Sequence, residues 1–238
     1  MKRGYGQYCP LALASELLGQ RWTVLVISRV VDGCTTFSEI RRGLPRISPS
    51  MLSRRLVELE DAGIIRRRKR TDRSTYTYHP TAAGKDLEDI IEKMAIWGQH
   101  WARDMSMDDL DSAFLAWSMH LRLNTDAMPP GRTVLEFDFA NPPEENERFW
   151  LVNEDGHVDM CLKHPGFETD LLVESNLRRF VETWRGFRDL GEELRSGQIT
   201  LTGPRQLKRA FPAWLLLSTF APYARKRPGL ERQLAGRC

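Results

Sequence analysis

The fold of the N-terminal part of the chain is decided by the stretch Ile47-Ser-Pro-Ser-Met-Leu-Ser-Arg-Arg-Leu-Val-Glu-Leu-Glu-Asp-Ala-Gly63. Ser48 is a favoured helix N-cap residue, and Pro49 occupies the first helical position, where its missing N–H costs nothing. Gly63 stands where a helix C-terminal cap is common. Leucine recurs at the spacing of one helical face, at Leu52, Leu56 and Leu59. The stretch therefore predicts a helix over residues 48–62 with one buried face.

The opposite face of this predicted helix is polar and carries short side chains. A helix of this kind can approach a DNA major groove closely and present hydrogen-bond donors to base edges and phosphates. We expect Ser50 and Arg54 to contact base edges and Arg55 to contact phosphate. The residues expected at the DNA surface are Ser48, Ser50, Met51, Ser53, Arg54 and Arg55. A solvated helix with a mixed polar face is the alternative that the helix by itself leaves open.

The segments before this helix complete a helix-turn-helix. Three helices are predicted there, over residues 9–19, 22–31 and 37–44. The last of them is short and ends before Pro45, and only a few residues separate it from Ser48. Two short helices joined in this way form a helix-turn-helix.

After Gly63 the hydrophobic pattern changes to that of strands. Residues 64–69 and 75–79 predict two strands, with residues 69–74 as the tip of a hairpin. A basic hairpin after a helix-turn-helix is the wing of a winged helix, and its arginines would lie along a DNA backbone or in a minor groove. The wing arginines in the predicted DNA surface are Arg66, Arg68, Arg70 and Arg73. A solvated basic loop is the alternative.

Charge is distributed unevenly along the chain, whose net charge is +3. Residues 1–104 hold 18 Lys and Arg against 12 Asp and Glu, whereas residues 105–238 hold 17 against 20. Residues 41–73 hold 11 basic residues against 4 acidic ones. Such concentrated positive charge predicts a polyanionic partner, here double-stranded DNA.

Composition predicts a cytoplasmic protein without a membrane partner. No apolar run reaches membrane-spanning length, and the N-terminal residues lack the apolar segment of a secretory signal. The four cysteines are scattered and form no CxxC pair, which fits a reducing compartment better than a disulfide framework.

A long helix from Ala82 to about Asp104, capped by Thr81, is predicted to pair with a second copy of the chain. Its apolar stripe is broad and aromatic and consists of Leu87, Ile90, Ile91, Met94, Trp97 and Trp101. Two-fold DNA sites favour two-fold symmetric proteins, so we expect a homodimer. A helix packed within its own chain is the alternative.

Seven short motifs follow one another along the first hundred residues. They are Cys9-Pro, Leu18-Gly-Gln-Arg-Trp-Thr23, Phe37-Ser-Glu-Ile40, Leu44-Pro-Arg-Ile-Ser-Pro49, Leu52-Ser-Arg-Arg-Leu56, Leu59-Glu-Asp-Ala-Gly63 and Tyr78-His-Pro-Thr81 through Gly84. Over about residues 7–101 the chain resembles the HxlR-type winged-helix transcriptional regulators of bacteria. The resemblance implies a homodimer with residues 48–62 in the major groove and the wing, residues 65–79, beside them. Pro80 departs from the family pattern, which usually has leucine there.

Cys9 carries a second implication of this resemblance. In some HxlR-type relatives the cysteine before this proline senses electrophiles or oxidants through adducts or intersubunit disulfides. The resemblance therefore leaves a redox-sensing role for Cys9 open. A buried, unreactive thiol is the alternative, because reactivity needs exposure and an electropositive environment.

The remaining residues predict a second domain that mixes helices and strands. A capping box at Ser106 predicts a helix, with an apolar face of Leu110, Phe114, Trp117 and Leu121. Strands are predicted over residues 133–139, 148–153, 157–162, 170–174 and 198–202, and helices over residues 176–185, 190–195 and from Pro204. With Leu194–Gly203 and Arg209–Trp214, this order resembles the sterol-carrier-protein-2-like fold over about residues 132–218.

That second resemblance implies an apolar tunnel between sheet and helices, and hence a small apolar ligand. The residues predicted to line it are Phe137, Phe139, Leu151, Met160 and Trp214. A filled core without a cavity is the alternative, because the same apolar residues would build it equally well.

Neither a metal site nor a catalytic site is predicted. His157, Asp159 and Cys161 alternate along one strand face, with His164 beyond, and these are zinc-ligand residue types. They lack a recognised ligand spacing, however, and a solvated strand face explains their alternation. The sequence has no nucleophile elbow and no phosphate-binding glycine loop, so we predict neither an enzyme nor a cofactor.

The sequence as a whole predicts an α+β transcription factor of two domains. Residues 1–104 would form the winged helix-turn-helix DNA-binding and dimerisation domain, and residues 105–238 the sterol-carrier-protein-2-like ligand-binding domain. A ligand that prefers one spacing of the two recognition helices would modulate operator binding. Two alternatives stay open: the second domain acts on an apolar metabolite as an enzyme or carrier, or it only stabilises the dimer.

Overall fold

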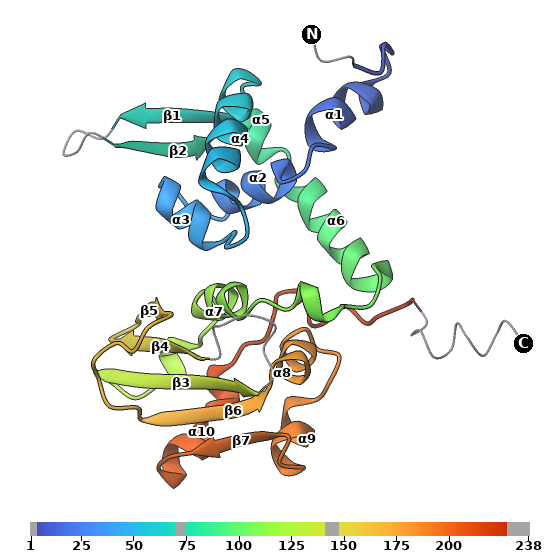
Figure 1. Ribbon diagram of the computed structural model, residues 1–238. Helices are drawn as coiled ribbons and strands as arrows, with labels where there is room; N and C mark the ends of the chain where they lie inside the picture. The colour runs from blue at the N-terminus through green and yellow to red at the C-terminus, as the bar shows by residue number, and fades with distance from the viewer. Residues whose placement is uncertain (1–3, 70–74, 141–147, 228–238) are drawn as a thin grey trace, which may run out of the picture. The chain divides into compact units, whose positions relative to one another are not determined.

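The computed structural model describes residues 4–69, 75–140 and 148–227, and the chain divides into two units, residues 1–94 and 95–238 (Figure 1). The division falls inside a helix, whereas the sequence placed it between residues 104 and 105. Among the described residues, no helix is both long enough and apolar enough to cross a membrane.

The first unit contains a helix-turn-helix followed by a two-stranded hairpin (Figure 1). Its elements are α1 (Pro10–Leu18), α2 (Thr23–Val31), α3 (Phe37–Arg42), α4 (Pro49–Asp61), β1 (Ile65–Lys69), β2 (Tyr76–Pro80), α5 (Ala82–Lys85) and the beginning of α6 (Glu88–Trp101). The two strands pair antiparallel, with Pro80 opposite Ile65 at the end of the ladder. This arrangement is the winged helix-turn-helix that the sequence predicts.

The core of the first unit lies between α2, α3, α4 and the base of the hairpin. Its fully buried side chains include Val26, Ile27, Ile40, Leu52, Leu56 and Leu59. The leucine spacing of α4 therefore marks the buried face correctly. Gly63, with a φ of +70°, follows α4 in the left-handed conformation that glycine adopts without strain.

The predicted long helix over residues 82–104 is instead two helices. Thr81 caps α5 as expected, because its hydroxyl accepts a hydrogen bond from the Gly84 N–H at 3.2 Å. The N–H of Leu87 then bonds to the carbonyl of Gly84 at 3.3 Å, a tight three-residue turn that separates α5 from α6. Gly84 also lies against the wing, since a Cβ there would meet the Ile64 carbonyl oxygen at 2.2 Å.

The second unit contains a five-stranded sheet covered on one face by helices (Figure 1). After the end of α6, its elements are the 3₁₀ turn η1 (Met107–Asp109), α7 (Ser112–His120), η2 (Thr125–Ala127), β3 (Arg132–Ala140), β4 (Arg148–Glu154), β5 (His157–Cys161), β6 (Leu171–Asn176), α8 (Leu177–Trp184), α9 (Leu190–Arg195), β7 (Ile199–Thr202) and α10 (Arg205–Trp214). The strand order is β5-β4-β3-β6-β7, in which β3 and β6 are parallel and the other neighbours antiparallel. The mixed α and β composition predicted for this region is therefore present.

The connection into the sheet differs from the expectation. Ser106 and Asp109 form the predicted capping box, but it closes only the turn η1. Helix α7 begins at Ser112 and is capped by Asp111, whose carboxylate accepts the Phe114 N–H at 2.9 Å. Leu115, Ala116 and Met119 of α7 face the core, whereas Phe114 and Leu121 are exposed. Of the four residues predicted on the inner face, only Leu110 and Trp117 are buried.

Candidate nucleic-acid interface

Helix α3 is held at its start by a reciprocal cap that the sequence analysis missed. The Thr36 hydroxyl accepts the Glu39 N–H at 3.2 Å, and the Glu39 carboxylate accepts the Thr36 N–H at 3.0 Å and the Thr35 N–H at 2.8 Å. Burial by itself would raise the pKa of Glu39, but these hydrogen bonds to Thr36 and Thr35 hold it below its usual value. The threonine followed three residues later by glutamate is a capping-box signature that could have predicted this contact.

Helix α4 begins as its sequence requires. Ser48 is the N-cap residue, and its hydroxyl accepts the Met51 N–H at 3.2 Å. Its hydroxyl also lies 3.2 Å from that of Ser50. The N-terminal turn therefore presents two neighbouring hydroxyl groups at the surface.

The outward face of α4 carries Ser50, Ser53 and Arg54, all exposed as expected. The Arg54 side chain is 58% exposed, and its Nε lies 3.1 Å from a Glu58 carboxylate oxygen. An exposed ion pair of this kind contributes less than about 1 kcal/mol, so it leaves the guanidinium available to another acceptor. Met51 is half-buried and packs partly against the core of the unit. It therefore stands at the edge of the exposed face.

Arg55 does not lie on this face, and its prediction as a phosphate contact is wrong. The residue is only 7% exposed. Its guanidinium donates to the Arg21 carbonyl at 2.9 Å and also bonds to Gln20 and Glu58. The side chain is satisfied inside the unit and ties α4 to the segment before α2.

Two arginines of the wing lie on the same face of the hairpin. Arg66 and Arg68 are exposed and, two residues apart in β1, project from the same side of the hairpin. Arg67 points the other way, where it pairs with Glu60 at 3.4 Å and lies 4.4 Å from the centre of the Tyr76 ring. Arg70 and Arg73, also predicted to contact DNA, lie outside the described residues.

Backbone contacts fix the wing beside the helix-turn-helix. The Tyr78 N–H donates to the Thr35 carbonyl at 2.7 Å, and the Thr81 hydroxyl donates to the Gly63 carbonyl at 2.6 Å. Burial raises the pKa of Tyr78, which packs against the core of the unit. The middle of β2 and the residue that follows it are thus attached to the segments that precede α3 and follow α4.

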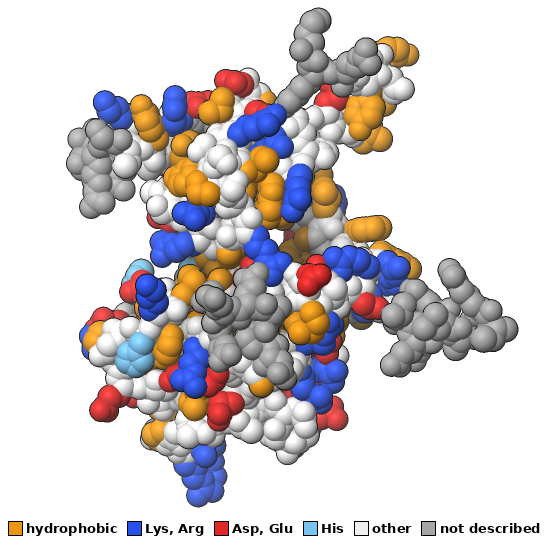
Figure 2. Space-filling model, in the orientation of Figure 1, with side chains coloured by type: hydrophobic (Ala, Val, Ile, Leu, Met, Phe, Trp, Pro, Cys, Tyr) orange, Lys and Arg blue, Asp and Glu red, His pale blue; other side chains and the backbone are white. Residues whose placement is uncertain are grey.

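Positively charged side chains also lie outside α4 and the wing (Figure 2). Arg41, Arg42 and Arg46, at the end of α3 and in the turn before α4, are exposed. The sequence predicts no individual role for these three arginines, because neither propensity nor spacing indicates which arginines face outward. They extend the positive surface from the wing to the turn.

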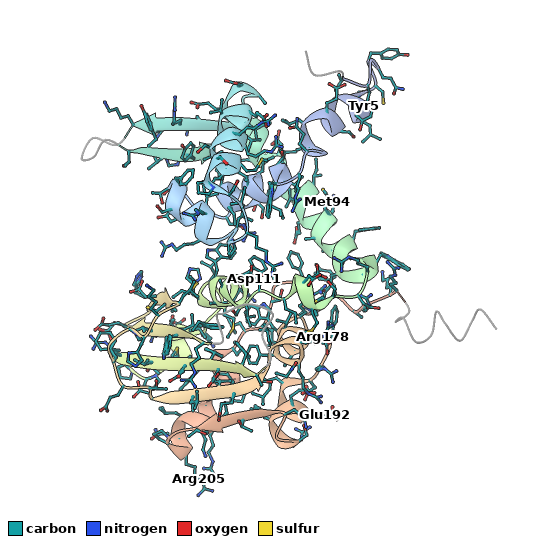
Figure 3. All side chains as sticks on the ribbon, in the orientation of Figure 1. Tyr5, Met94, Asp111, Arg178, Glu192 and Arg205 are labelled. Carbon is teal, nitrogen blue, oxygen red and sulfur yellow. The ribbon has the colours of Figure 1, made fainter. Side chains whose placement is uncertain are left out.

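The apolar stripe of α6 divides into two sets. Leu87 and Ile91 turn inward and pack against the core of the first unit, which corrects their placement in a dimer interface. Ile90, Met94, Trp97 and Trp101 are all exposed, Trp97 to 64%. Their spacing places them along one side of the helix, and Figure 3 shows the labelled Met94 on α6.

Cys9, the residue before α1, is exposed and free. Cys34 and Cys161 are also free but half-buried, and burial raises the pKa of both thiols. Cys238 lies outside the described residues. The redox role of Cys9 stays a prediction.

The residues predicted to line an apolar tunnel are packed against one another and against neighbouring core residues. The rings of Phe137 and Phe149 are 4.8 Å apart, and those of Phe139 and Phe180 are 5.3 Å apart. Trp214 is fully buried, and its indole N–H donates to the Ala127 carbonyl at 2.9 Å. Leu151 is buried in the same core, and Met160 packs at its margin. The predicted tunnel is therefore corrected to a filled core at these positions, because aromatic rings occupy the space between sheet and helices.

The strand residues considered as metal ligands are on the surface. His157 and Asp159 lie 3.5 Å apart, and both side chains are mostly exposed. Within the part of the chain that the structure describes, no group of three or more His, Cys, Asp or Glu residues could hold a metal ion.

Comparison with known proteins finds relatives of the first unit. The family model described as HxlR-like helix-turn-helix matches residues 17–106. The uncharacterised HTH-type transcriptional regulator YvaP of Bacillus subtilis is 32% identical over 43% of this chain and 96% of its own length. The HTH-type transcriptional regulator YodB of Bacillus subtilis is 35% identical over 39% of this chain and 85% of its own.

Solved structures are similar over the same region. The reduced form of YodB from Bacillus subtilis is 34% identical, covering 39% of this chain and 93% of its own, with a TM-score of 0.35. The redox regulator HypR in its oxidised form is 33% identical, covering 38% and 95%, with a TM-score of 0.36. Because YvaP and YodB are matched over most of their own length, the chain belongs to the HxlR-like helix-turn-helix family of transcriptional regulators.

Proposed function

We propose that the chain binds operator DNA as a homodimer, with α4 in the major groove and the wing on the adjacent backbone. The observation that carries this proposal is the exposed face of α4, where Ser50, Ser53 and Arg54 stand clear of the core. Membership of a transcriptional regulator family supports it.

The chemistry of the exposed side chains assigns them different tasks. Arg54 can donate two hydrogen bonds to the O6 and N7 atoms of guanine, and the short hydroxyl side chains of Ser50 and Ser53 allow the helix to approach closely. Arg66 and Arg68 present guanidinium groups that suit phosphate oxygens. Base preference would therefore come from α4, and sequence-independent affinity from the wing.

Two substitutions separate base recognition by α4 from phosphate binding by the wing. Arg54→Ala is expected to relax base preference at one position and to weaken specific binding by about 1–3 kcal/mol. Arg68→Ala is expected to weaken binding to all sequences and to reduce the slope of log affinity against log salt by about one. Selection from a random duplex pool, followed by fluorescence anisotropy on the selected duplex, measures both effects.

Lys163→Ala, an exposed cation of the second unit, is the matched control for charge and should change neither quantity. If Arg54→Ala selects the same sequence with the same affinity as the wild-type chain, the orientation assigned to α4 is wrong.

A homodimer would cover the exposed stripe of α6. Ile90, Met94, Trp97 and Trp101 offer a continuous apolar strip, and large exposed apolar surfaces mark association sites. Trp97→Glu is expected to convert the dimer to a monomer, because it would bury a charge in the contact. Light scattering at micromolar concentration measures the mass.

Leu121→Glu places the same charge at another exposed apolar position, on the residue after α7, and should remain dimeric. A wild-type chain that is monomeric at that concentration would contradict the proposed dimer.

For the second unit we infer a sterol-carrier-protein-2-like fold. The order of four strands, two helices, a strand and a helix from β3 to α10 supports this inference. An apolar ligand inside the sheet–helix core is not part of the proposal, because Phe137, Phe139 and Trp214 fill that space.

A further inference from the structure

Helix α10 carries a positive face on the surface of the second unit. Arg205, Lys208 and Arg209 are exposed, and Figure 3 shows the labelled Arg205 projecting away from the fold. Residues 199–224 include three Lys and Arg, all of them in α10, but no Asp or Glu. This run stands out because residues 105–238 as a whole have more acidic than basic side chains.

Most arginines of the second unit already have partners. Arg179 pairs with Glu193, Arg188 pairs with Glu182, and Arg225 pairs with Asp104. By contrast, no described residue forms a hydrogen bond or an ion pair with the side chains of Arg205, Lys208 or Arg209. Three uncompensated cations on one short helix repel one another, so an anionic partner would stabilise the arrangement.

The apolar side chains of α10 pack against the core of the second unit. Phe211 and Trp214 are buried, and Leu207 and Ala210 pack against the same core. A helix that binds a membrane surface inserts large apolar side chains beside its cations, and α10 has none exposed between Arg205 and Arg209. Because α10 has exposed positive charge but no large apolar side chain exposed beside it, it is suited to bind a polyanion through the phosphate groups of that partner.

We propose that α10 is a second DNA-contact surface that binds the phosphate backbone. This inference rests on the proposed function, since the operator bound through α4 is the polyanion that α10 would also contact. Arg205 and Arg209 are four residues apart and therefore neighbours on one side of the helix. They line a shallow cleft together with Gln206 and Ala210. Contact there adds affinity without base preference.

The test compares four full-length proteins on one random-sequence duplex of about 40 base pairs, titrated between about 50 and 200 mM salt. They are the wild type, Arg205→Gln/Arg209→Gln, the charge-matched control Lys163→Gln/Lys226→Gln, and the wing variant Arg68→Gln. The slope of log affinity against log salt is expected to decrease by about two in the α10 double variant. The control should keep the wild-type slope, and circular dichroism should be unchanged in every variant because all five substituted positions are exposed.

The outcomes separate this inference from the proposed function. If the wing variant lowers the slope but the α10 double variant does not, the α10 surface is overturned and operator binding stands. If the wild-type chain does not bind the duplex even at low salt, both fail. If the double variant loses binding to phosphatidylserine vesicles while keeping its DNA slope, α10 faces lipid and the inference is overturned.

Discussion

Arg55→Ala is expected to lower the free energy of unfolding of the first unit by about 1.5–3 kcal/mol, the range for losing hydrogen bonds to a charged group. The guanidinium bonds to the Arg21 carbonyl, to Gln20 and to Glu58 while only 7% of the residue is exposed. Its removal takes one donor from the Arg21 carbonyl, from Gln20 and from Glu58, which keeps its contact with Arg54, and leaves a cavity between α4 and the segment before α2. Urea titration followed by hydrogen exchange of the α2 and α4 peptides measures the loss.

The neighbouring arginine is the matched control. Arg54→Ala should change the stability of the unit by less than about 0.5 kcal/mol, because surface substitutions rarely do more. If Arg55→Ala is as stable as Arg54→Ala but loses DNA affinity, Arg55 contacts phosphate after all, and the buried position described here is wrong.

Trp214→Ala is expected to destabilise the second unit by about 3–5 kcal/mol, the usual range for removing a buried tryptophan. Its ring is fully buried among the side chains of the sheet and helices, and its indole N–H bonds to the Ala127 carbonyl. The substitution removes the packing contacts and also leaves that carbonyl without its donor. Hydrogen exchange of the peptides that contain β3, β6 and α10 localises the effect.

Leu216→Ala is the control for this prediction, because Leu216 lies two residues further along the chain and is exposed. It should leave exchange in the sheet unchanged. A Trp214→Ala protein with wild-type exchange would show that Trp214 lines open space, as the sequence analysis expected.

The sequence predicts α4 well because every signal for it is local. The Ser48 cap, Pro49 and the leucine spacing all lie within the helix or next to it, and the structure reproduces them. The distinction between Arg54 and Arg55 could not be predicted in the same way. It depends on Gln20 and the Arg21 carbonyl, which are distant in sequence and meet Arg55 only after folding.

The apolar stripe of α6 shows a similar limit. Leu87 and Ile91 pack inward while Ile90 and Met94 are exposed, although all four residues fit one broad helical face. Hydrophobic periodicity identifies the stripe but does not say which edge of it meets the core. Helix α6 follows the tight turn at Gly84 and Leu87, and Gly84 packs against the Ile64 carbonyl, which is distant in sequence.

The predicted tunnel failed for a different reason. Phe137 and Phe139 alternate along β3 and Trp214 lies in α10, and apolar residues at such positions would line a cavity or fill a core equally well. Only the packing distances between the rings decide, and these depend on how closely α7, α8 and α10 approach the sheet.

The anchoring of Arg55 has a consequence for how members of this family diverge. The orientation of α4 is set partly by Gln20 and by the backbone at Arg21, neither of which belongs to the exposed face of α4. If α4 reads the operator as proposed, a substitution at residue 20 that moves the helix would redirect Arg54. Operator preference would then change although every residue on the exposed face of α4 stayed the same.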